Sequence, residues 1–237
     1  MSDRKRVVYE PHVGASRQYW RDMVLGVNDG LVSMFLLVAG VVGGGLDRRQ
    51  VLLTAVAGAI AGSVSMAAGE YLATKSQSEV LESEIDLEKV HIEHFRNREL
   101  AQLHQLFRDI GIEEDDLSDV VQAFSRDDQT LLNAMKVMEF GMVESEERSP
   151  IKAMWMSGGL FFSGSIPSVA PFLFDLRPHV ALAIAAGLAA IALFAVGVVK
   201  TFITRGNPIM AGLENLAIAG IGGVVAYGVG RVVGVAV

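Results

Sequence analysis

The hydrophobic residues of this 237-residue chain come in long blocks, unlike the periodic stripes of a soluble domain. A helix needs about 20 consecutive apolar residues to cross the hydrocarbon core of a bilayer. The first block starts too late in the chain, and is followed by too many others, to be a cleaved signal peptide. The pattern therefore predicts five membrane-spanning helices, at 23–45, 51–73, 153–174, 179–203 and 208–235.

The chain between the second and third blocks is polar and is expected to fold outside the bilayer. Residues 76–109 contain no proline or glycine and carry apolar residues at intervals, which predicts one continuous helix with a partly buried face. A second helix is predicted over 114–125. A third is expected to begin near Asp127 or Asp128, either of which suits an N-cap, and to run to about residue 147.

These elements predict an all-α polytopic membrane protein with a helical insert between spans two and three. Lysine and arginine residues gather in the N-terminal segment, at the junctions of the insert and in the loop between spans four and five. The positive-inside rule then places the N-terminus and the insert in the cytoplasm, beside a plasma, inner or vacuole-type membrane. The predicted divisions are an N-terminal segment 1–22, spans one and two in 23–75, the insert 76–149, and spans three to five in 150–237.

Small residues and prolines predict how the spans pack. Gly58 and Gly62 in the second span have the spacing that lets two helix backbones approach closely. Pro167 and Pro171 in the third span predict a kink, because a proline inside a helix leaves a backbone carbonyl without its donor.

The charge of the chain is concentrated in the insert. Residues 76–149 hold nineteen Asp and Glu against seven Lys and Arg, a net charge of about −12 in a chain whose total is −7. Such an acidic surface excludes a nucleic-acid partner. The chain has no cysteine, which excludes disulfides and thiolate metal sites. It also lacks a phosphate-binding glycine loop and a nucleophile with its base, so neither an ATP-driven pump nor an enzyme is expected.

Two carboxylates stand inside the apolar blocks. Asp29 lies in VLGVNDGLVSMFLLVAG, and Glu70 lies near the end of the second span, one helical turn after Met66 and on the same face. Ionisable residues in a span usually face a bundle interior, a cavity or a transport path. The alternative is a structural acid that is protonated or hydrogen-bonded to its neighbours and, for Glu70, a side chain that faces the membrane interface.

Metal-ligating residue types recur in the first predicted helix of the insert. Glu84, Glu88 and His91 follow an i, i+4, i+7 spacing, so they share one side of a helix, and Glu99 lies further along. The Glu88-x-x-His91 pair has the spacing found in di-iron carboxylate bundles. Carboxylate with imidazole suits Fe²⁺, Mn²⁺, Co²⁺ or Zn²⁺. The alternative interpretation is a solvated acidic helix face.

The third predicted helix of the insert adds Met135 and Glu139, a thioether beside a carboxylate. Methionine sulfur disfavours hard ions such as Mg²⁺ and Ca²⁺. The alternative is that the methionines of this helix only pack against other apolar residues.

Four segments taken together resemble the vacuolar iron transporter family. They are RDMVLGVNDGLVSMFLLVAG, SVSMAAGEYLATKSQ, the acidic helical insert and GGVVAYGVGR. The resemblance covers nearly the whole chain. It implies a dimer of five-span protomers with a cytoplasmic metal-binding domain after span two, and export of Fe²⁺, often also Mn²⁺, from the cytosol in exchange for protons.

The resemblance also implies roles for single residues. It makes Asp29 and Met66 metal-path residues of the membrane part, and places Glu88 and Glu99 on metal-binding glutamates of the insert. The remaining two matches, on the methionine and glutamate of the third insert helix, are Met135 and Glu139.

Three positions depart from the family pattern. His91 stands at an insert position that is usually glutamate, and it still suits a divalent transition metal. Gln102 stands at a further ligand position and is a weaker, neutral ligand. Gly58 lies eight residues before Met66, where the family often has an acid, so a residue for proton coupling or metal transfer is missing there.

The sequence thus predicts a homodimeric secondary transporter that exports Fe²⁺, Mn²⁺ or both, with Co²⁺ and Zn²⁺ as further candidate substrates. No resident cofactor is expected; the predicted partners are the lipid bilayer, divalent metal ions, protons and a second copy of the chain. The alternative is a membrane-anchored divalent-metal-binding or sensing module, whose spans only anchor and dimerise the insert.

Overall fold

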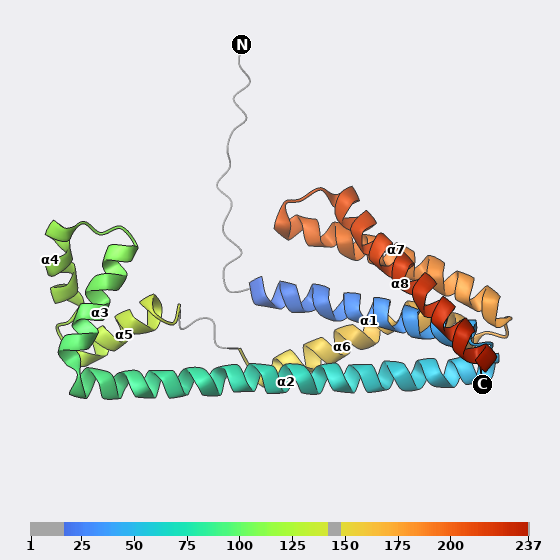
Figure 1. The fold of residues 1–237 in the computed structure, drawn as a ribbon, viewed down its shortest axis with the longest axis horizontal. Helices are drawn as coiled ribbons and strands as arrows, with labels where there is room; N and C mark the ends of the chain where they lie inside the picture. The colour runs from blue at the N-terminus through green and yellow to red at the C-terminus, as the bar shows by residue number, and fades with distance from the viewer. Residues whose placement is uncertain (1–16, 142–147, 237) are drawn as a thin grey trace, which may run out of the picture. The chain divides into compact units, whose positions relative to one another are not determined.

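The structure, a computed structural model, describes residues 17–141 and 148–236, and every regular element in these ranges is a helix (Figure 1). The predicted all-α class is therefore confirmed, while most of the predicted N-terminal segment 1–22 lies outside the described residues. The elements are α1 Arg17–Gly43, α2 Arg48–His94, α3 Arg96–Asp109, α4 Glu114–Phe124, α5 Asp128–Met138, α6 Pro150–Val169, the 3-10 helix η3 Ala170–Leu173, α7 Pro178–Thr204 and α8 Pro208–Ala236.

The chain divides into two compact units. The apolar unit comprises the described residues of Met1–Tyr71 and Ile151–Val237, and the insert unit comprises those of Leu72–Pro150. Helix α2 contributes to both units, because it runs for 47 residues without a break. The end of the second apolar block therefore does not coincide with the end of a helix.

Four helices in the described ranges are long and apolar enough to cross a membrane by length and composition, namely α1, α2, α7 and α8. They contain four of the five predicted spans. The remaining block, 153–174, is divided between α6 and η3. Pro167 lies inside the last turn of α6 and Pro171 lies in η3, so the predicted irregularity takes the form of a change from α-helix to a tighter 3-10 turn.

Close backbone approach holds α1 against α6 and α8. A side chain on Gly30 would overlap the backbone of Phe161 in α6, and one on Gly230 in α8 would overlap the backbone of Gly40 in α1. Helices α7 and α8 pack against each other and against α1, as Figure 1 shows. Glycine is required at these contacts, since a neighbouring backbone cannot give way as a flexible side chain can.

Replacing Gly30 by alanine is expected to destabilise the purified protein by about 1–3 kcal/mol, the usual cost of overpacking a tight contact. The comparison is Gly159→Ala on α6, where an added methyl group has no neighbour within 4 Å. Thermal unfolding in detergent measures both variants. Equal unfolding temperatures for the two would contradict the close approach of α1 and α6.

Gly58 and Gly62 perform a different task from the predicted one. A Cβ atom on Gly58 would lie 2.5 Å from the Cδ2 atom of Leu37, and one on Gly62 would overlap the ring of Phe161. The two glycines form notches in α2 that receive large side chains from α1 and α6. The position where the resembled family often has an acid is thus occupied by the side chain of Leu37.

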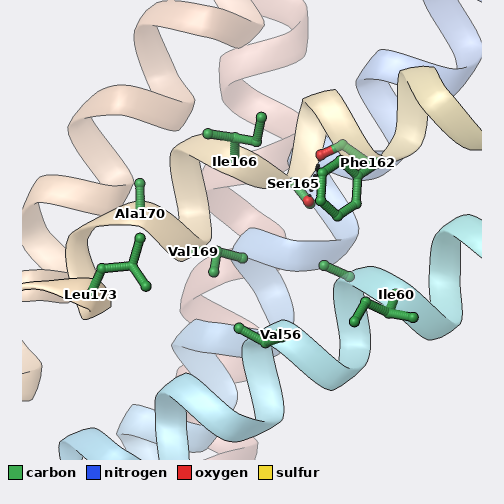
Figure 2. A pocket seen from close by; sticks show the side chains of 9 residues that line it. Val56, Ile60, Phe162, Ser165, Ile166, Val169, Ala170 and Leu173 are labelled. Carbon is green, nitrogen blue, oxygen red and sulfur yellow. Dashed lines mark hydrogen bonds between the residues drawn. The ribbon is translucent and has the colours of Figure 1, made fainter.

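A groove of about 200 Å³ lies between α2 and the end of α6. Figure 2 shows Val56 and Ile60 of α2 facing Ile166 and its neighbours on α6 and η3. The only polar side chain in the lining is Ser165, whose hydroxyl donates to the carbonyl oxygen of Phe162 at 2.6 Å. The groove is therefore lined almost entirely by apolar side chains.

The insert unit has a small apolar core where α3, α4 and α5 meet. Its fully buried members include Leu103, Leu117 and Leu131, one from each helix. The predicted second helix, 114–125, is confirmed as α4, and the predicted cap at Asp127 is confirmed because its carboxylate accepts from the amide of Thr130 at 2.8 Å. Helix α5 ends at Met138, earlier than predicted.

The first helix of the insert is not continuous, contrary to the prediction. Phe95 has φ −129° and ψ 30°, and it separates α2 from α3. Arg96, the next residue, donates to the carbonyl oxygen of Ser125 at 2.8 Å and pairs with Asp128, so the start of α3 is tied to the turn between α4 and α5. Tertiary contacts outweigh the helix propensity of the local sequence at this point.

Candidate metal site

Glu88 and His91 on α2 and Glu99 on α3 form one group in the insert unit. One potential ligand atom from each residue lies within 4.8 Å of the other two. The Nδ1 atom of His91 is 3.8 Å from Oε2 of Glu88 and 3.6 Å from Oε1 of Glu99. The break at Phe95 brings these residues together, because it turns α3 back beside the end of α2.

Both carboxylates of this group are buried and incompletely satisfied. Glu88 is 4% exposed and Glu99 is 3% exposed. One oxygen of each, Oε1 of Glu88 and Oε2 of Glu99, is buried without a hydrogen-bond partner. Among the described residues, His91 is the only basic side chain within 4 Å of either acid. Burying two acids in this way is costly unless a cation or a proton joins them.

The electrostatics of the group favour a bound cation. Burial, together with the nearby charges of Glu99 and Glu139, raises the pKa of Glu88 from 4.5 to about 7, and burial is the largest of the three causes. Near neutral pH this carboxyl group therefore holds a proton part of the time. A divalent ion would displace that proton and supply the positive charge that the site lacks.

Metal binding to the full-length protein is accordingly expected to strengthen as pH rises from 5 to about 7, and to level off above it. Below the raised pKa of Glu88 each bound ion must expel a proton, which costs up to about tenfold in affinity per pH unit. Calorimetry or dye competition at several pH values measures this. An affinity that does not change across this range would contradict the role given to Glu88.

The metal-free protein should show the opposite trend in stability. In the folded state the carboxyl group of Glu88 holds its proton up to about pH 7, whereas in the unfolded chain it loses the proton near pH 4.5. Between these values the folded state binds more protons, so this group stabilises the fold at low pH and the contribution is lost as pH rises through 7.

Glu84 and Glu139 do not belong to this group of three, and the role of Met135 as a ligand stays a prediction. Glu84 is exposed on α2, one turn before Glu88. Met135 is fully buried in the apolar core of the insert unit, among residues such as Leu103 and Leu131. Glu139, at the C-terminal end of α5, is exposed and acts on Glu88 through its charge.

In the apolar unit, Asp29 is half-buried on α1. One of its oxygens, Oδ1, accepts a hydrogen bond of 2.8 Å from the hydroxyl of Ser33, one turn further along. Met66 is partly buried against the core formed by α1, α2 and α6, and Glu70 is half-buried one turn later on α2. The second carboxylate oxygen of Asp29 takes no part in this hydrogen bond, as a metal ligand requires. The hydrogen bond from Ser33 also fits the alternative, in which Asp29 is a structural acid that bonds only its neighbour.

Sequence reasoning missed a buried carboxylate at the start of α1. Asp22 is 3% exposed, with Arg21 at 3.3 Å, although it falls in the segment predicted to be polar and outside the bilayer. Its spacing of seven residues from Asp29 was the available signal, since such residues share one side of a helix. A further acid of the apolar unit, Glu214 on α8, is exposed, unlike Asp22, and pairs with Lys200 on α7 at 3.7 Å.

Comparisons with known proteins show similarity over most of the chain. The VIT family profile matches residues 20–231. Vacuolar iron transporter 1 of Oryza sativa subsp. japonica is 27% identical over 213 residues, covering 90% of this chain and 84% of the relative. Vacuolar iron transporter 1 of Arabidopsis thaliana is 29% identical over 215 residues, covering 90% and 85%. The Vacuolar iron transporter of Toxoplasma gondii is 28% identical over 230 residues, covering 93% and 76%.

The matched region takes in the apolar helices, the Asp29 segment and the whole insert unit. The family is one of membrane transporters and not of enzymes, and the apolar helices make this chain an integral membrane protein. Since the family profile spans nearly the entire sequence, the chain belongs to the VIT family.

Proposed function

We propose that this chain is a secondary transporter that exports Fe²⁺, Mn²⁺ or both from the cytosol in exchange for protons. The observation that carries the proposal is the group of Glu88, His91 and Glu99, which combines metal-ligating atoms with two buried, incompletely satisfied carboxylates. Relatives named vacuolar iron transporters match about nine-tenths of the chain, which supports iron as a substrate.

The proposed arrangement has five spans, a cytoplasmic insert and two copies of the chain. Exposed apolar side chains support it, since residues such as Leu53 on α2 (72% exposed) and Val224 on α8 (76% exposed) need lipid or a second copy beside them. Helix α6 with η3 supplies the fifth span in this arrangement. The same exposure would also suit a single copy surrounded by lipid, so chemical cross-linking in membranes tests the dimer separately.

In the proposed mechanism the insert gathers metal from the cytosol and the apolar unit moves it across the bilayer. Asp29 and Met66 provide a carboxylate and a thioether on the path, and Glu70 lies one helical turn from Met66. A carboxylate in such a path can exchange a proton for a cation, which couples the two movements at one residue. With Gly58 in place of an acid, Asp29 and Glu70 are left to carry that coupling.

Reconstitution into sealed liposomes tests the proposal. Uptake of Fe²⁺, Mn²⁺, Co²⁺ and Zn²⁺ is measured with and without a pH gradient, and the internal pH is followed with a trapped dye. Metal flux that depends on the gradient, with matching proton movement in the opposite direction, is the expected result. Metal flux without proton movement would contradict the proposed proton antiport but would leave the proposal of metal transport standing.

The second candidate is a membrane-anchored metal-binding or sensing module. One observation favours it: all three residues of the metal group lie in the insert unit, and none lies in the apolar unit. Such a protein would bind metal with the same affinity but would give no flux in sealed liposomes. Binding without flux would therefore replace the transporter by the sensor.

A further inference from the structure

The metal group contains one nitrogen donor, and its position is well defined. Nδ1 of His91 faces Oε2 of Glu88 at 3.8 Å and Oε1 of Glu99 at 3.6 Å. Both distances are too long for hydrogen bonds, so the three groups face one another without satisfying one another. An ion bound among them would be held by one nitrogen and at least two oxygens.

The surroundings of the group limit what else could fill it. The two carboxylates are buried, and one oxygen of each has no hydrogen-bond partner. His91 is 39% exposed, so the group is open to solvent on the side of the imidazole. This geometry leaves coordination positions for water and gives an ion a way in, while the carboxylates stay fixed by burial.

We infer that His91 is the residue that sets the metal preference of this insert, favouring Fe²⁺ and Co²⁺ over Mn²⁺. The inference rests on the proposed function and narrows it, since that proposal leaves Fe²⁺ and Mn²⁺ unranked. Carboxylate, carbonyl and water ligands suit Mg²⁺, Ca²⁺ and Mn²⁺, whereas imidazole suits later transition metals. An all-carboxylate group would bind Mn²⁺ relatively well, and exchanging one oxygen donor for nitrogen steepens the rise in affinity from Mn²⁺ to Fe²⁺ and Co²⁺.

The test compares His91→Glu with the parent protein, both as full-length chains in detergent. Both carry Asp29→Asn, so that the membrane carboxylate does not contribute to binding. Co²⁺ serves as the stable probe for Fe²⁺; its visible absorption reports the nitrogen ligand, and the loss of the free Mn²⁺ signal in electron paramagnetic resonance reports Mn²⁺ binding. The control is His104→Glu on α3, a histidine outside the group that pairs with Glu114 at 3.7 Å.

His91→Glu is expected to lower the ratio of Co²⁺ to Mn²⁺ affinity several-fold, because an oxygen donor that Mn²⁺ accepts well replaces the nitrogen donor that favours Co²⁺. The Co²⁺ absorption bands should change in the same variant. His104→Glu should alter neither quantity. If His91→Glu does not fold, as judged by circular dichroism and gel filtration, His91→Gln gives the same comparison without adding a negative charge.

An unchanged affinity ratio together with unchanged Co²⁺ bands in a folded His91 variant would overturn the inference. This failure is distinguishable from failure of the proposed function. If the chain with Asp29 intact transports metal, and its Asp29→Asn form keeps the same selectivity when His91 is replaced, only the inference is contradicted. A protein whose selectivity depends on His91 but which gives no flux contradicts only the transporter.

Discussion

Replacing Asp29 by asparagine is expected to abolish metal flux in reconstituted liposomes while the protein still folds and inserts. The amide keeps the shape of the side chain and can still accept the hydrogen bond that Ser33 now donates to Oδ1 at 2.8 Å. It removes the negative charge and the exchangeable proton. A divalent ion in an apolar helix bundle needs that charge, since its desolvation is otherwise uncompensated.

The control for Asp29→Asn is Asp175→Asn, which neutralises a carboxylate that is 98% exposed in the loop before α7. Initial uptake rates, normalised to inserted protein, measure both variants. The control should transport at the rate of the parent protein. Parent-like flux in a well-inserted Asp29→Asn protein would return Asp29 to the structural alternative, an acid that only bonds its neighbour.

The second large effect is expected in the insert. Glu88→Ala combined with His91→Ala should weaken metal binding to the full-length protein by at least about 10–100-fold, since even supporting groups around a metal are worth that much. The variant removes two of the three members of the group and leaves Glu99 buried without its His91 partner. Isothermal calorimetry with Mn²⁺ or Co²⁺ measures the affinity.

A matched double variant, Glu84→Ala with His104→Ala, removes the same residue types from the same unit. Glu84 is exposed, and His104 pairs with Glu114 outside the group. Its affinity should stay within a few-fold of the parent value, because solvated charges contribute little to a site several residues away. If both double variants bind equally well, the Glu-x-x-His spacing marks only an acidic helix face.

The sequence predicted the helices well because their signals are strong. Blocks of about 20 apolar residues specify a membrane helix through length alone. The Asp127 cap could be predicted because a short side chain must satisfy the first free amides of α5, and it accepts from Thr130. The continuity of α2 through the end of the second apolar block could not be predicted. The change from apolar to polar residues there marks the end of the membrane span, and it does not show whether the helix also ends.

The site could be predicted only in part, and Phe95 explains why. On one straight helix Glu88 and Glu99 would be about 16 Å apart along the axis, at about 1.5 Å for each of eleven residues. The structure instead places an oxygen of each within 4 Å of Nδ1 of His91, because the chain turns at Phe95. That turn depends on Arg96 reaching α4 and α5, which is a contact between residues distant in sequence.

The same turn explains the position of Glu84. Helical spacing places Glu84, Glu88 and His91 on one side of α2, and this much is correct. Only the end of that side is covered when α3 folds back, so Glu88 is buried and Glu84 stays exposed. Met135 lies in the apolar core of the insert unit, which fits the packing alternative, and its role as a ligand stays a prediction.

The two buried carboxylates on either side of the Phe95 turn would link the lifetime of the protein to the supply of metal. In the metal-free protein, repulsion between ionised Glu88 and Glu99 would oppose their close approach, and a bound ion would join them and so tie α3 to α2. Binding to the folded state alone would add about 2.7 kcal/mol at a free metal concentration of one hundred times Kd. A cell short of metal would then hold a looser insert, more often open to proteases, and the amount of this protein in the membrane would fall without any change in its synthesis.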